Sequence, residues 1–529
     1  MKVFLASFLA SLFVILVTLV IFASLYQVLN TQDKTIFLNT IEESGIIAAP
    51  RNGTAITNYS GISWSDYDSD DKIDVLISRG TTALYKNNGN GTFTDVTKAS
   101  GLENSFSTSG VFGDYDNDGC PDLFLSRPNK LFRNNCGGIF ADVTARTGIK
   151  DFESARGASW ADYDGDGLLD LYVASHGLSE IGDKYLYFSE PNALYRNNGN
   201  GTFTNITQRA GVSGAADCGI EGLVERGHIE TVGGPYKESF QPIWLDYNSD
   251  GKIDLFISTD AGISPLYKNN GGGIFVDVTK EAGLCRHGSG MGAAAADYDN
   301  NGHVDIYVTN IGYNYLWHNN GDGTFTEMAG DTKVADIASL GWGTGFFDYN
   351  NDGLLDLYVT NGIAQDVTGK VFDGVKLDRL YKNIGGGQFL EISQKSGIGG
   401  NYNKEPSAFA DFDNNGFPDI FVLSGRYEKN HIYSLYKNQG NTNNWLKVKL
   451  VGTKSNRDAI GARIKVETGT GTQLREITSG TSFLSQDSLW QTFGLGTSTA
   501  ANVEVMWPSG QKQSIGIVNA NQTITIKEP

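Results

Sequence analysis

Basic residues are scarce in this 529-residue chain, which has 41 Lys and Arg against 60 Asp and Glu. The formal net charge of −19 argues against a nucleic-acid partner, because phosphate backbones require a basic surface. Zinc is also disfavoured, because the four cysteines form no CxxC pair and no histidine pair lies nearby. Proline is sparse and helix-favouring runs are rare, while glycine reaches 66 residues. This composition favours many short strands joined by tight turns.

One long uncharged segment stands at the amino terminus, from Val3 to Leu29. A membrane-spanning helix needs about 20 apolar residues, whereas the apolar core of a signal peptide has about 7–15. No clear small-x-small cleavage site follows, so the sequence predicts an uncleaved signal-anchor helix over residues 1–30 that contacts the membrane. A cleaved signal peptide is the alternative. In both cases the rest of the chain is exported and becomes an extracellular or periplasmic part, tethered to the cell surface or secreted.

The four cysteines are an even number in a chain predicted to be exported, which permits disulfides. Cys120 opens one predicted strand and Cys136 closes the next, so the two lie opposite each other in a hairpin centred near residue 128. The sequence therefore predicts a Cys120–Cys136 disulfide. A Cys218–Cys285 disulfide is the remaining pairing, and no geometric reason in the sequence supports it.

An aspartate-rich motif recurs seven times, as in "ADYDGDGLLDLYVA" (161–174) and "FDYNNDGLLDLYVT" (347–360). Each copy is followed by a second segment such as "ALYKNNGNGTFTDVT" (83–97), in which an Asn-Gly turn separates two alternating runs. Such turns between alternating runs are typical of β-hairpins. Four antiparallel strands in about 50 residues form one blade of a propeller.

The predicted fold class is therefore all-β, with a seven-bladed β-propeller over residues 31–440 and a small β domain over residues 441–529. The seventh unit lacks its fourth strand, and "KTIFLNTIEESGI" (34–46) matches the fourth-strand segment "GTFTDVTKASGL" (91–102). We expect this amino-terminal strand to complete the last blade and remove an exposed sheet edge. An open solenoid of seven repeats is the alternative, but it gives that strand no role.

Each motif has Asp at position 1, Asp or Asn at positions 3 and 5, usually Gly at position 6, and Asp at position 9. Oxygen ligands at alternating positions converge when the loop curls around a hard cation, and Gly permits the sharp turn. Three or four carboxylates with carbonyl and water oxygens suit Ca²⁺ better than Mg²⁺, so we predict up to seven structural Ca²⁺ ions. EF-hand loops are excluded because the flanks are strands. The predicted ligands are Asp66, Asp68, Asp70 and Asp74; Asp114, Asp116, Asp118 and Asp122; Asp162, Asp164, Asp166 and Asp170; Asp246, Asn248, Asp250 and Asp254; Asp297, Asp299, Asn301 and Asp305; Asp348, Asn350, Asp352 and Asp356; and Asp411, Asp413, Asn415 and Asp419.

The alternative interpretation of these segments is a set of Asx turns without metal. The copies also differ in charge, because Asn replaces Asp at position 3 or 5 in the last four copies, and position 6 of the first copy is Asp71. Fewer carboxylates imply weaker calcium binding. We therefore expect the second and third copies, which have four carboxylates each and Gly at position 6, to retain their metal longest.

Long insertions occur only in the turns that follow the second and fourth strands, so all of them project from the face opposite the Asp loops. They are residues 175–192, 208–242, 361–378 and 424–431. Long loops on one face of a rigid scaffold are common recognition surfaces. His176 and His228 could meet over the channel there, although solvated loop histidines are the simpler interpretation. The candidate ligand contacts are Tyr185, Tyr187, Glu221, Glu225, Arg226, His228 and Tyr236.

The repeats resemble the FG-GAP/VCBS class of propeller repeats. The tail, with "GTSFLSQDSLWQTFGLG" (480–496) and "VEVMWPSGQKQSI" (503–515), resembles the ASPIC/UnbV domain. The combination is similar to the family of cartilage acidic protein and its microbial relatives. The resemblance implies an exported calcium-binding propeller associated with adhesion or extracellular matrix, and it supplies no ligand.

These observations favour a calcium-stabilised module that binds a glycan or a protein through the inserted-loop face. No nucleophile elbow, P-loop or zincin motif occurs in the sequence, which favours a binding module over an enzyme. Two alternatives stay open because propeller scaffolds serve several classes of function. One is a polysaccharide lyase or hydrolase, which would gather a base with arginine and acids on the insertion face. The other is a structural component of the cell surface.

Overall fold

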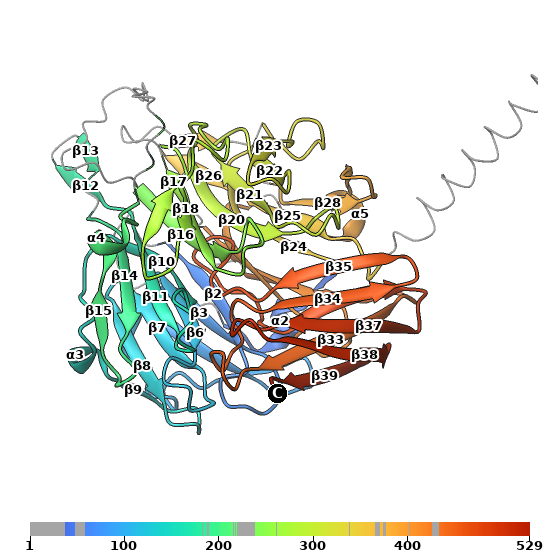
Figure 1. The fold of residues 1–529 in the computed structure, drawn as a ribbon, viewed down its shortest axis with the longest axis horizontal. Helices are drawn as coiled ribbons and strands as arrows, with labels where there is room; N and C mark the ends of the chain where they lie inside the picture. Colours follow the sequence, from blue (N-terminus) through green and yellow to red (C-terminus); the bar gives the residue numbers. More distant parts are fainter. Residues whose placement is uncertain are drawn as a thin grey trace, which may run out of the picture.

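A computed structural model gives the fold of the chain (Figure 1). It describes residues 37–47 and 59–529, except 182–183, 188–189, 215, 217, 219–237, 261, 338, 366–370, 374–376, 401 and 426–432. The described part is all-β, and its helices are single turns: α2 (Ile41–Ser44), α3 (Thr144–Thr147), α4 (Thr207–Ala210) and α5 (Ser393–Ser396). These turns follow outer strands and end at Gly45, Gly148, Gly211 and Gly397, each with a positive φ that favours glycine.

The seven repeats form antiparallel sheets of the kind that build propeller blades. In the first sheet, β3 is long enough to serve as both the second and third strand, and β5 pairs with it. The strands, sheet by sheet, are β2 (Gly61–Ser65), β3 (Asp74–Asn87), β4 (Phe93–Asp95) and β5 (Phe106–Ser107); β6 (Ser109–Gly113), β7 (Asp122–Ser126), β8 (Lys130–Asn134) and β9 (Phe140–Asp142); β10 (Ala155–Ala161), β11 (Asp170–Ser175), β14 (Ala193–Asn197) and β15 (Phe203–Asn205); β16 (Glu238–Leu245), β17 (Asp254–Asp260), β18 (Leu266–Asn269) and β19 (Phe275–Asp277); β20 (Gly290–Ala296), β21 (Asp305–Asn310), β22 (Tyr315–Asn319) and β23 (Phe325–Glu327); β24 (Gly341–Phe347), β25 (Asp356–Asn361), β28 (Arg379–Asn383) and β29 (Phe389–Glu391); and β30 (Lys404–Ala410), β31 (Asp419–Ser424), β32 (Tyr433–Asn438) and β1 (Phe37–Asn39).

The second strands are buried along their whole length, because a neighbouring sheet covers each face. Their near-continuous apolar sequences fit this two-sided burial. The outer strands are different: in β9 and β15 only the first residue, a phenylalanine, is buried. Aromatic side chains fill the space between sheets, as where Trp64 of the first sheet stacks on Phe412 of the seventh with ring centroids 6.3 Å apart.

The amino-terminal strand joins the last sheet, as predicted. β1 pairs antiparallel with β32 in the register Phe37↔Asn438, and the sheet order is β1-β32-β31-β30. The first strands of the sheets also contact one another in sequence, from β2 through β6, β10, β16, β20 and β24 to β30, which returns to β2. The described sheets therefore lie around a common channel.

The carboxy-terminal strands form two further sheets, of order β36-β33-β39 and β35-β34-β37-β38 (red in Figure 1). β33 and β39 are parallel, and the other described pairs are antiparallel. The apolar faces of these strands are contiguous with those of the second and third repeats: Leu446 and Ile464 belong to one buried cluster with Val111 and Trp160. The strands are β33 (Asn444–Val451), β34 (Arg463–Thr468), β35 (Gly471–Glu476), β36 (Gln491–Gly496), β37 (Ala500–Met506), β38 (Lys512–Asn519) and β39 (Gln522–Lys527).

A loop of these strands, residues 478–490, enters the channel between the first strands, and we call it the plug loop. Gln486 exchanges hydrogen bonds with both backbone groups of Phe112, at 2.7 and 3.1 Å. Leu484 donates its backbone N–H to Gln241 at 3.0 Å, and Thr344 donates to the Ser482 hydroxyl at 3.0 Å. The sequence predicted a separate small domain. The plug loop of this predicted domain hydrogen-bonds to the second, fourth and sixth sheets.

Both cysteine pairs are joined. The Cys120–Cys136 disulfide, with Cα atoms 5.2 Å apart, spans the β7–β8 hairpin whose register places its centre near residue 128, as predicted. The Cys218–Cys285 disulfide is also present, with Cα atoms 5.9 Å apart. The predicted anchor over residues 1–30 lies outside the described residues. Within the described ranges, the structure has no helix with the length and apolar character needed to span a bilayer.

Candidate functional site

The Asp motifs form seven loops of one shape, each joining the first strand of a sheet to the second. In every loop the position-1 carboxylate accepts the backbone N–H groups of positions 5 and 6, which closes the loop. For Asp162 the donors are Asp166 at 3.0 Å and Gly167 at 2.9 Å. The equivalent acceptors are Asp66, Asp114, Asp246, Asp297, Asp348 and Asp411. The loops therefore keep their shape through their own hydrogen bonds.

Two positions of each loop have a positive φ. Position 6 is glycine in six loops, as with Gly251 at +83°, and Asp71 adopts +60° in the first. Position 4, which the sequence pattern did not single out, is also left-handed and is occupied by Gly, Asn or Ser, as with Ser69 at +58° and Asn117 at +56°. Asparagine tolerates this region better than most residues.

The position-9 aspartates begin the second strands and are fully buried. Desolvation by burial raises the pKa of Asp74 and Asp254 to about 8 and that of Asp122 to about 9, and the like charges of the same loop add to the shift. Several carboxylate oxygens of the loops have no hydrogen-bond partner among the described residues. They are Oδ2 of Asp74 and Asp254 and Oδ1 of Asp68, Asp116 and Asp164.

The carboxylates of a loop converge on one point. Ligand atoms of Asp162, Asp164 and Asp170 lie within 4.8 Å of one another, and the second loop contains the equivalent group. In the first loop the grouped ligands are Asp66, Asp68 and Asp70, at positions 1, 3 and 5. Buried, converging oxygens that lack donors fit a hard divalent cation, because such an ion would supply the missing positive charge. The residues present therefore fit calcium.

A basic side chain from the third strand contacts the acids of every loop, which the sequence interpretation missed. Arg196 binds Asp164 at 2.6 Å and Asp166 at 2.7 Å, and Arg133 makes the same pair of contacts with Asp116 and Asp118. The other contacts are Lys86–Asp68, Lys268–Asp250, His318–Asp299, Lys382–Asp352 and Lys437–Asp413. The signal was available, since a basic residue precedes Asn in every "LYKN", "LFRN" or "LWHN" segment.

The small domain lies against the face that carries the Asp loops, and its basic side chains meet several position-1 aspartates. Lys449 lies 3.3 Å from Asp66, and Arg463 lies 3.4 Å from Asp246. Lys447 forms an ion pair with Asp411. This face of the ring is therefore largely occupied by the chain itself.

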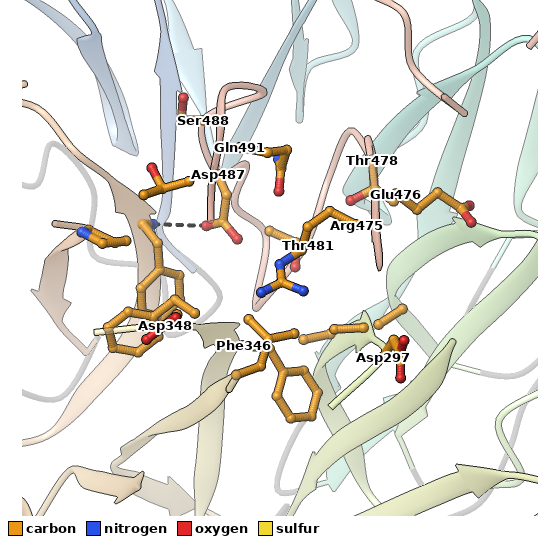
Figure 2. A pocket seen from close by; sticks show the side chains of 18 of the residues that line it. Asp297, Phe346, Asp348, Arg475, Glu476, Thr478, Thr481, Asp487, Ser488 and Gln491 are labelled. Carbon is orange, nitrogen blue, oxygen red and sulfur yellow. Dashed lines mark hydrogen bonds between the residues drawn. The ribbon is translucent and has the colours of Figure 1, made fainter. Parts of the chain in front are cut away.

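A small cavity of about 120 Å³ lies between the plug loop and the first strands of the fifth to seventh sheets. Figure 2 shows the Arg475 side chain in it, with Asp297 and Asp348 on either side. Burial lowers the pKa of Arg475 to about 10 against the opposing effect of these two carboxylates. Asp487 of the plug loop also lines this cavity and accepts the backbone N–H of Phe409 at 2.9 Å.

The described parts of the insertions follow second and fourth strands and so lie on the face opposite the Asp loops. Two of them contain short hairpins, β12 (Leu178–Ile181) with β13 (Lys184–Tyr187), and β26 (Ile363–Gln365) with β27 (Val371–Asp373). Tyr185 and Tyr187 stand on β13, and the structure does not describe their side chains. The other predicted contacts lie outside the described residues: Glu221, Glu225, Arg226, His228 and Tyr236.

His176 is buried rather than solvated, which corrects the sequence interpretation. It is 2% exposed, its ring stacks on Phe240 at 4.1 Å, and its nitrogens lie 3.8 Å from Glu238 and 3.6 Å from Asp260. The cause is that Glu238, Phe240 and Asp260 of the fourth sheet lie against its ring. Tyr59 is adjacent, with its ring 6.0 Å from that of His176 and under the guanidinium of Arg156. The described inserted-loop face thus gathers a histidine, a tyrosine, an arginine and two acids that spacing did not reveal.

Comparison with family models finds two matches. An "FG-GAP-like repeat" model matches residues 66–125, 246–308 and 297–359, and an "ASPIC and UnbV" model matches residues 452–529. Among curated proteins, cartilage acidic protein 1 of Mus musculus is 28% identical over 393 residues, covering 71% of this chain and 55% of that protein. The Homo sapiens protein is 26% identical, with 71% and 53% covered. The chain thus spans about half the length of the curated relatives it matches.

Solved structures similar to this chain include two lectins. An Agrocybe aegerita lectin that recognises non-reducing terminal N-acetylglucosamine is 20% identical, with a TM-score of 0.37 over 65% of this chain and 84% of the lectin. The BP39L lectin of Burkholderia pseudomallei is 10% identical, with a TM-score of 0.42 over 72% and 95%. An exotype rhamnogalacturonan lyase, YesX, is 13% identical, with a TM-score of 0.32 over 89% and 68%.

Proposed function

Because the chain carries FG-GAP-like repeats and an ASPIC and UnbV domain, we propose that it is an exported, calcium-stabilised propeller that binds a glycan or a protein. Its role would be adhesion or ligand binding outside the cytoplasm. The observation that carries the calcium part is the set of buried carboxylate oxygens without donors in the repeated loops.

The loops would hold calcium through the side chains at positions 1, 3, 5 and 9, as the sequence predicted. A bound ion would supply positive charge that the loops lack. The ion would offset the repulsion between the carboxylates and would fix the turn between the first and second strands of each sheet. The third-strand basic residues already neutralise part of this charge and compete with the metal. Arg133 and Arg196 each contact two acids, so in the second and third loops this competition opposes the advantage of four carboxylates, on which the expectation of longest metal retention rests.

We further propose that the ring has seven blades and is closed by β1. The cyclic contacts of the first strands, the packing of Trp64 on Phe412 and the β1–β32 pairing support this arrangement. The boundaries of the two domains, residues 31–440 and 441–529, belong to the same proposal. The tether over residues 1–30 also remains a proposal.

The inserted-loop face is the better candidate for ligand binding. The small domain covers the Asp-loop face and the plug loop fills the channel, so neither leaves an open path to the ring interior. The opposite face carries the described parts of the long insertions. A binding partner that meets the ring would therefore contact the loops at residues 175–192, 208–242, 361–378 and 424–431.

A glycan and polysaccharide array probed with the 529-residue chain tests this function, with calcium and with EGTA. Binding without turnover supports the module, and loss of binding in EGTA supports calcium as its structural ion. A protein that binds no calcium in metal analysis and keeps its melting temperature in EGTA would refute the calcium part. Variation of Tyr185 or Tyr187 should weaken binding if the ligand reaches β13.

The second candidate is a polysaccharide lyase or hydrolase, and the cluster around His176 favours it. A buried histidine between two carboxylates, with Tyr59 and Arg156 beside it, is the combination of base, acids and arginine that such chemistry uses. Product release from the same polysaccharide array, abolished by His176→Ala with folding retained, would favour the enzyme. Self-association without ligand binding or turnover would favour a structural surface component.

A further inference from the structure

The third strand of every sheet ends in an asparagine whose side chain is buried, and no function above uses it. These residues, which we call the clasp asparagines, are Asn87, Asn134, Asn197, Asn269, Asn319, Asn383 and Asn438. Each stands directly after the basic residue that contacts the Asp loop. A buried amide of this kind must have its hydrogen bonds satisfied, so its partners show what it holds.

Each clasp asparagine holds the position-9 aspartate of its own sheet. The backbone N–H of Asn197 donates to Oδ1 of Asp170 at 2.7 Å. The same bond, at 2.7 or 2.8 Å, occurs in the other six sheets. Position 9 is one of the proposed calcium ligands, and this donor fixes the orientation of its carboxylate.

The side chain of each clasp asparagine reaches the Asp loop of the preceding sheet. Nδ2 of Asn197 donates to the backbone carbonyl of Tyr115, position 2 of the second loop, at 2.8 Å. It also donates to the carbonyl of Leu169 in its own loop at 3.1 Å. The inter-sheet bond recurs in every repeat at 2.7 or 2.8 Å, with carbonyls of Tyr67, Tyr163, Tyr247, Tyr298, Tyr349 and Phe412 as the other acceptors.

The bonds close into a ring. Asn87 of the first sheet donates to Phe412 of the seventh, so the last loop is held by the first sheet. Five position-2 residues also donate their own N–H to the position-9 carboxylate of their loop, as Tyr115 does to Asp122 at 3.2 Å. In those loops the position-2 residue binds the position-9 carboxylate of its own loop through its N–H and the clasp asparagine of the next sheet through its carbonyl. That asparagine in turn binds the next position-9 carboxylate through its backbone N–H.

From this geometry we propose that each clasp asparagine positions the calcium ligands of two adjacent loops, so that occupancy of one loop favours occupancy of its neighbour. The inference rests on the proposed calcium binding. Partners that orient metal ligands without touching the metal typically change affinity by about 10- to 100-fold when they are removed. Replacement by alanine keeps the backbone N–H that binds the position-9 carboxylate and removes the Nδ2 donors to the carbonyls of both loops. A clasp variant should therefore weaken its own loop and the preceding one by at least about tenfold each through loss of these side-chain bonds.

The test variant is Asn197→Ala, and the matched control is Asn198→Ala in the same turn. Asn198 is exposed and contacts only Thr202 and Thr204. Calcium bound per chain is measured by mass spectrometry of the metal after dialysis of the 529-residue protein against EGTA-buffered calcium. At a free calcium of about ten times the Kd of the unmodified loops, a tenfold weakening halves the occupancy of two loops and a 100-fold weakening nearly empties them. We therefore expect about one to two fewer ions in Asn197→Ala and no loss in the control.

Knock-outs of single loops identify which ions are lost. In an Asp116→Ala background, which removes a side-chain ligand of the second loop, Asn197→Ala should cost about half as many ions as in the unmodified protein. In an Asp299→Ala background, which removes a side-chain ligand of the distant fifth loop, it should cost as many as in the unmodified protein. An equal loss in both backgrounds would overturn the proposal, because the effect would be confined to the third loop.

A merely structural asparagine would behave differently. It would lower the melting temperature equally in calcium and in EGTA and leave the ion count unchanged, which would also overturn the proposal. Should Asn197→Ala not fold, Asn197→Ser retains a short polar side chain for Gly199, whose N–H the asparagine now accepts at 3.0 Å. If the unmodified protein binds no calcium, the proposed function itself fails, and that outcome is distinct from an unaltered ion count in the variant.

Discussion

The two faces of the ring are built from loops of opposite character. On the Asp-loop face, seven loops repeat one hydrogen-bond pattern, and the position-1 carboxylates accept their donors at 2.7–3.2 Å in every copy. On the opposite face the insertions differ in length and sequence. The comparison teaches that the repeated face is suited to stabilising the scaffold, whereas the loops of the varied face are suited to binding a partner.

Removal of divalent ions should have the largest effect, and it should act on the Asp-loop face. An ion that binds only the folded state stabilises it by about 2.7 kcal/mol per site when its free concentration is 100 times Kd. Several loops emptied by EGTA should therefore lower the melting temperature by far more than any single substitution. Differential scanning calorimetry measures the shift, and hydrogen exchange should increase first in the Asp loops. An increase confined to the inserted-loop face would contradict the assignment.

The two disulfides allow the faces to be compared directly, because each face has one. Cys120–Cys136 links an Asp loop to a neighbouring turn across 16 residues, and Cys218–Cys285 ties the insertion of residues 208–242 to the next repeat across 67. Closing the longer loop restricts the unfolded chain more. The loop-closure model gives about 4 kcal/mol for Cys218–Cys285 and about 3 kcal/mol for Cys120–Cys136.

Paired serine variants, Cys218→Ser with Cys285→Ser and Cys120→Ser with Cys136→Ser, measure these losses by denaturant unfolding. The Cys120–Cys136 pair should also change calcium binding, since Cys120 occupies position 7 of the second loop. The Cys218–Cys285 pair should leave the ion count unaltered. The reverse result would mean that the faces are not independent.

The plug loop connects the faces, and Asp487 makes its contribution pH-dependent. Burial raises the pKa of Asp487 to about 7. A carboxyl with a raised pKa in the folded state contributes stability below its unfolded value near 4, and this is lost as pH rises to about 7. The free energy of unfolding of Asp487→Asn should therefore rise relative to that of the unmodified protein by about 1.4 kcal/mol for each pH unit within this range. Urea unfolding at pH 5, 6 and 7 checks this, and a gap that shrinks with pH would contradict it.

The sequence was sufficient for the features that repeat and insufficient for those that depend on distant segments. The Asp loops, the strands and the role of β1 follow from spacing, because each copy repeats the same local pattern. The bond between Gln486 and Phe112 joins residues 374 positions apart, and no periodicity indicates it. The burial of His176 likewise depends on Glu238, Phe240 and Asp260 of another sheet. The third-strand basic residues also repeat along the sequence, but only the fold shows that they contact the Asp loops.

Exchange of position 6 between two loops gives the smallest effect and tests the regularity of the Asp-loop face itself. Asp71 adopts a φ of +60° at a position where the other six loops have glycine. A left-handed conformation costs an ordinary residue about 1–2 kcal/mol, and replacement by glycine removes this cost. Part of the resulting stabilisation is lost again because glycine loses more conformational entropy on folding. Asp71→Gly also removes the exposed contact with Lys449 at 2.9 Å, so we expect a net stabilisation below about 1 kcal/mol.

The reciprocal variant Gly251→Asp isolates the backbone term. A Cβ at Gly251, where φ is +83°, would meet no atom within 4 Å, so any destabilisation comes from the conformation and the added charge. We expect a loss of about 1 kcal/mol in EGTA, and a smaller loss in calcium if the added carboxylate strengthens the ion's binding. Urea unfolding of both variants in each condition measures the four values. Equal losses in calcium and EGTA would show that charge at position 6 does not act on the metal, and that the first loop differs from the others only in strain.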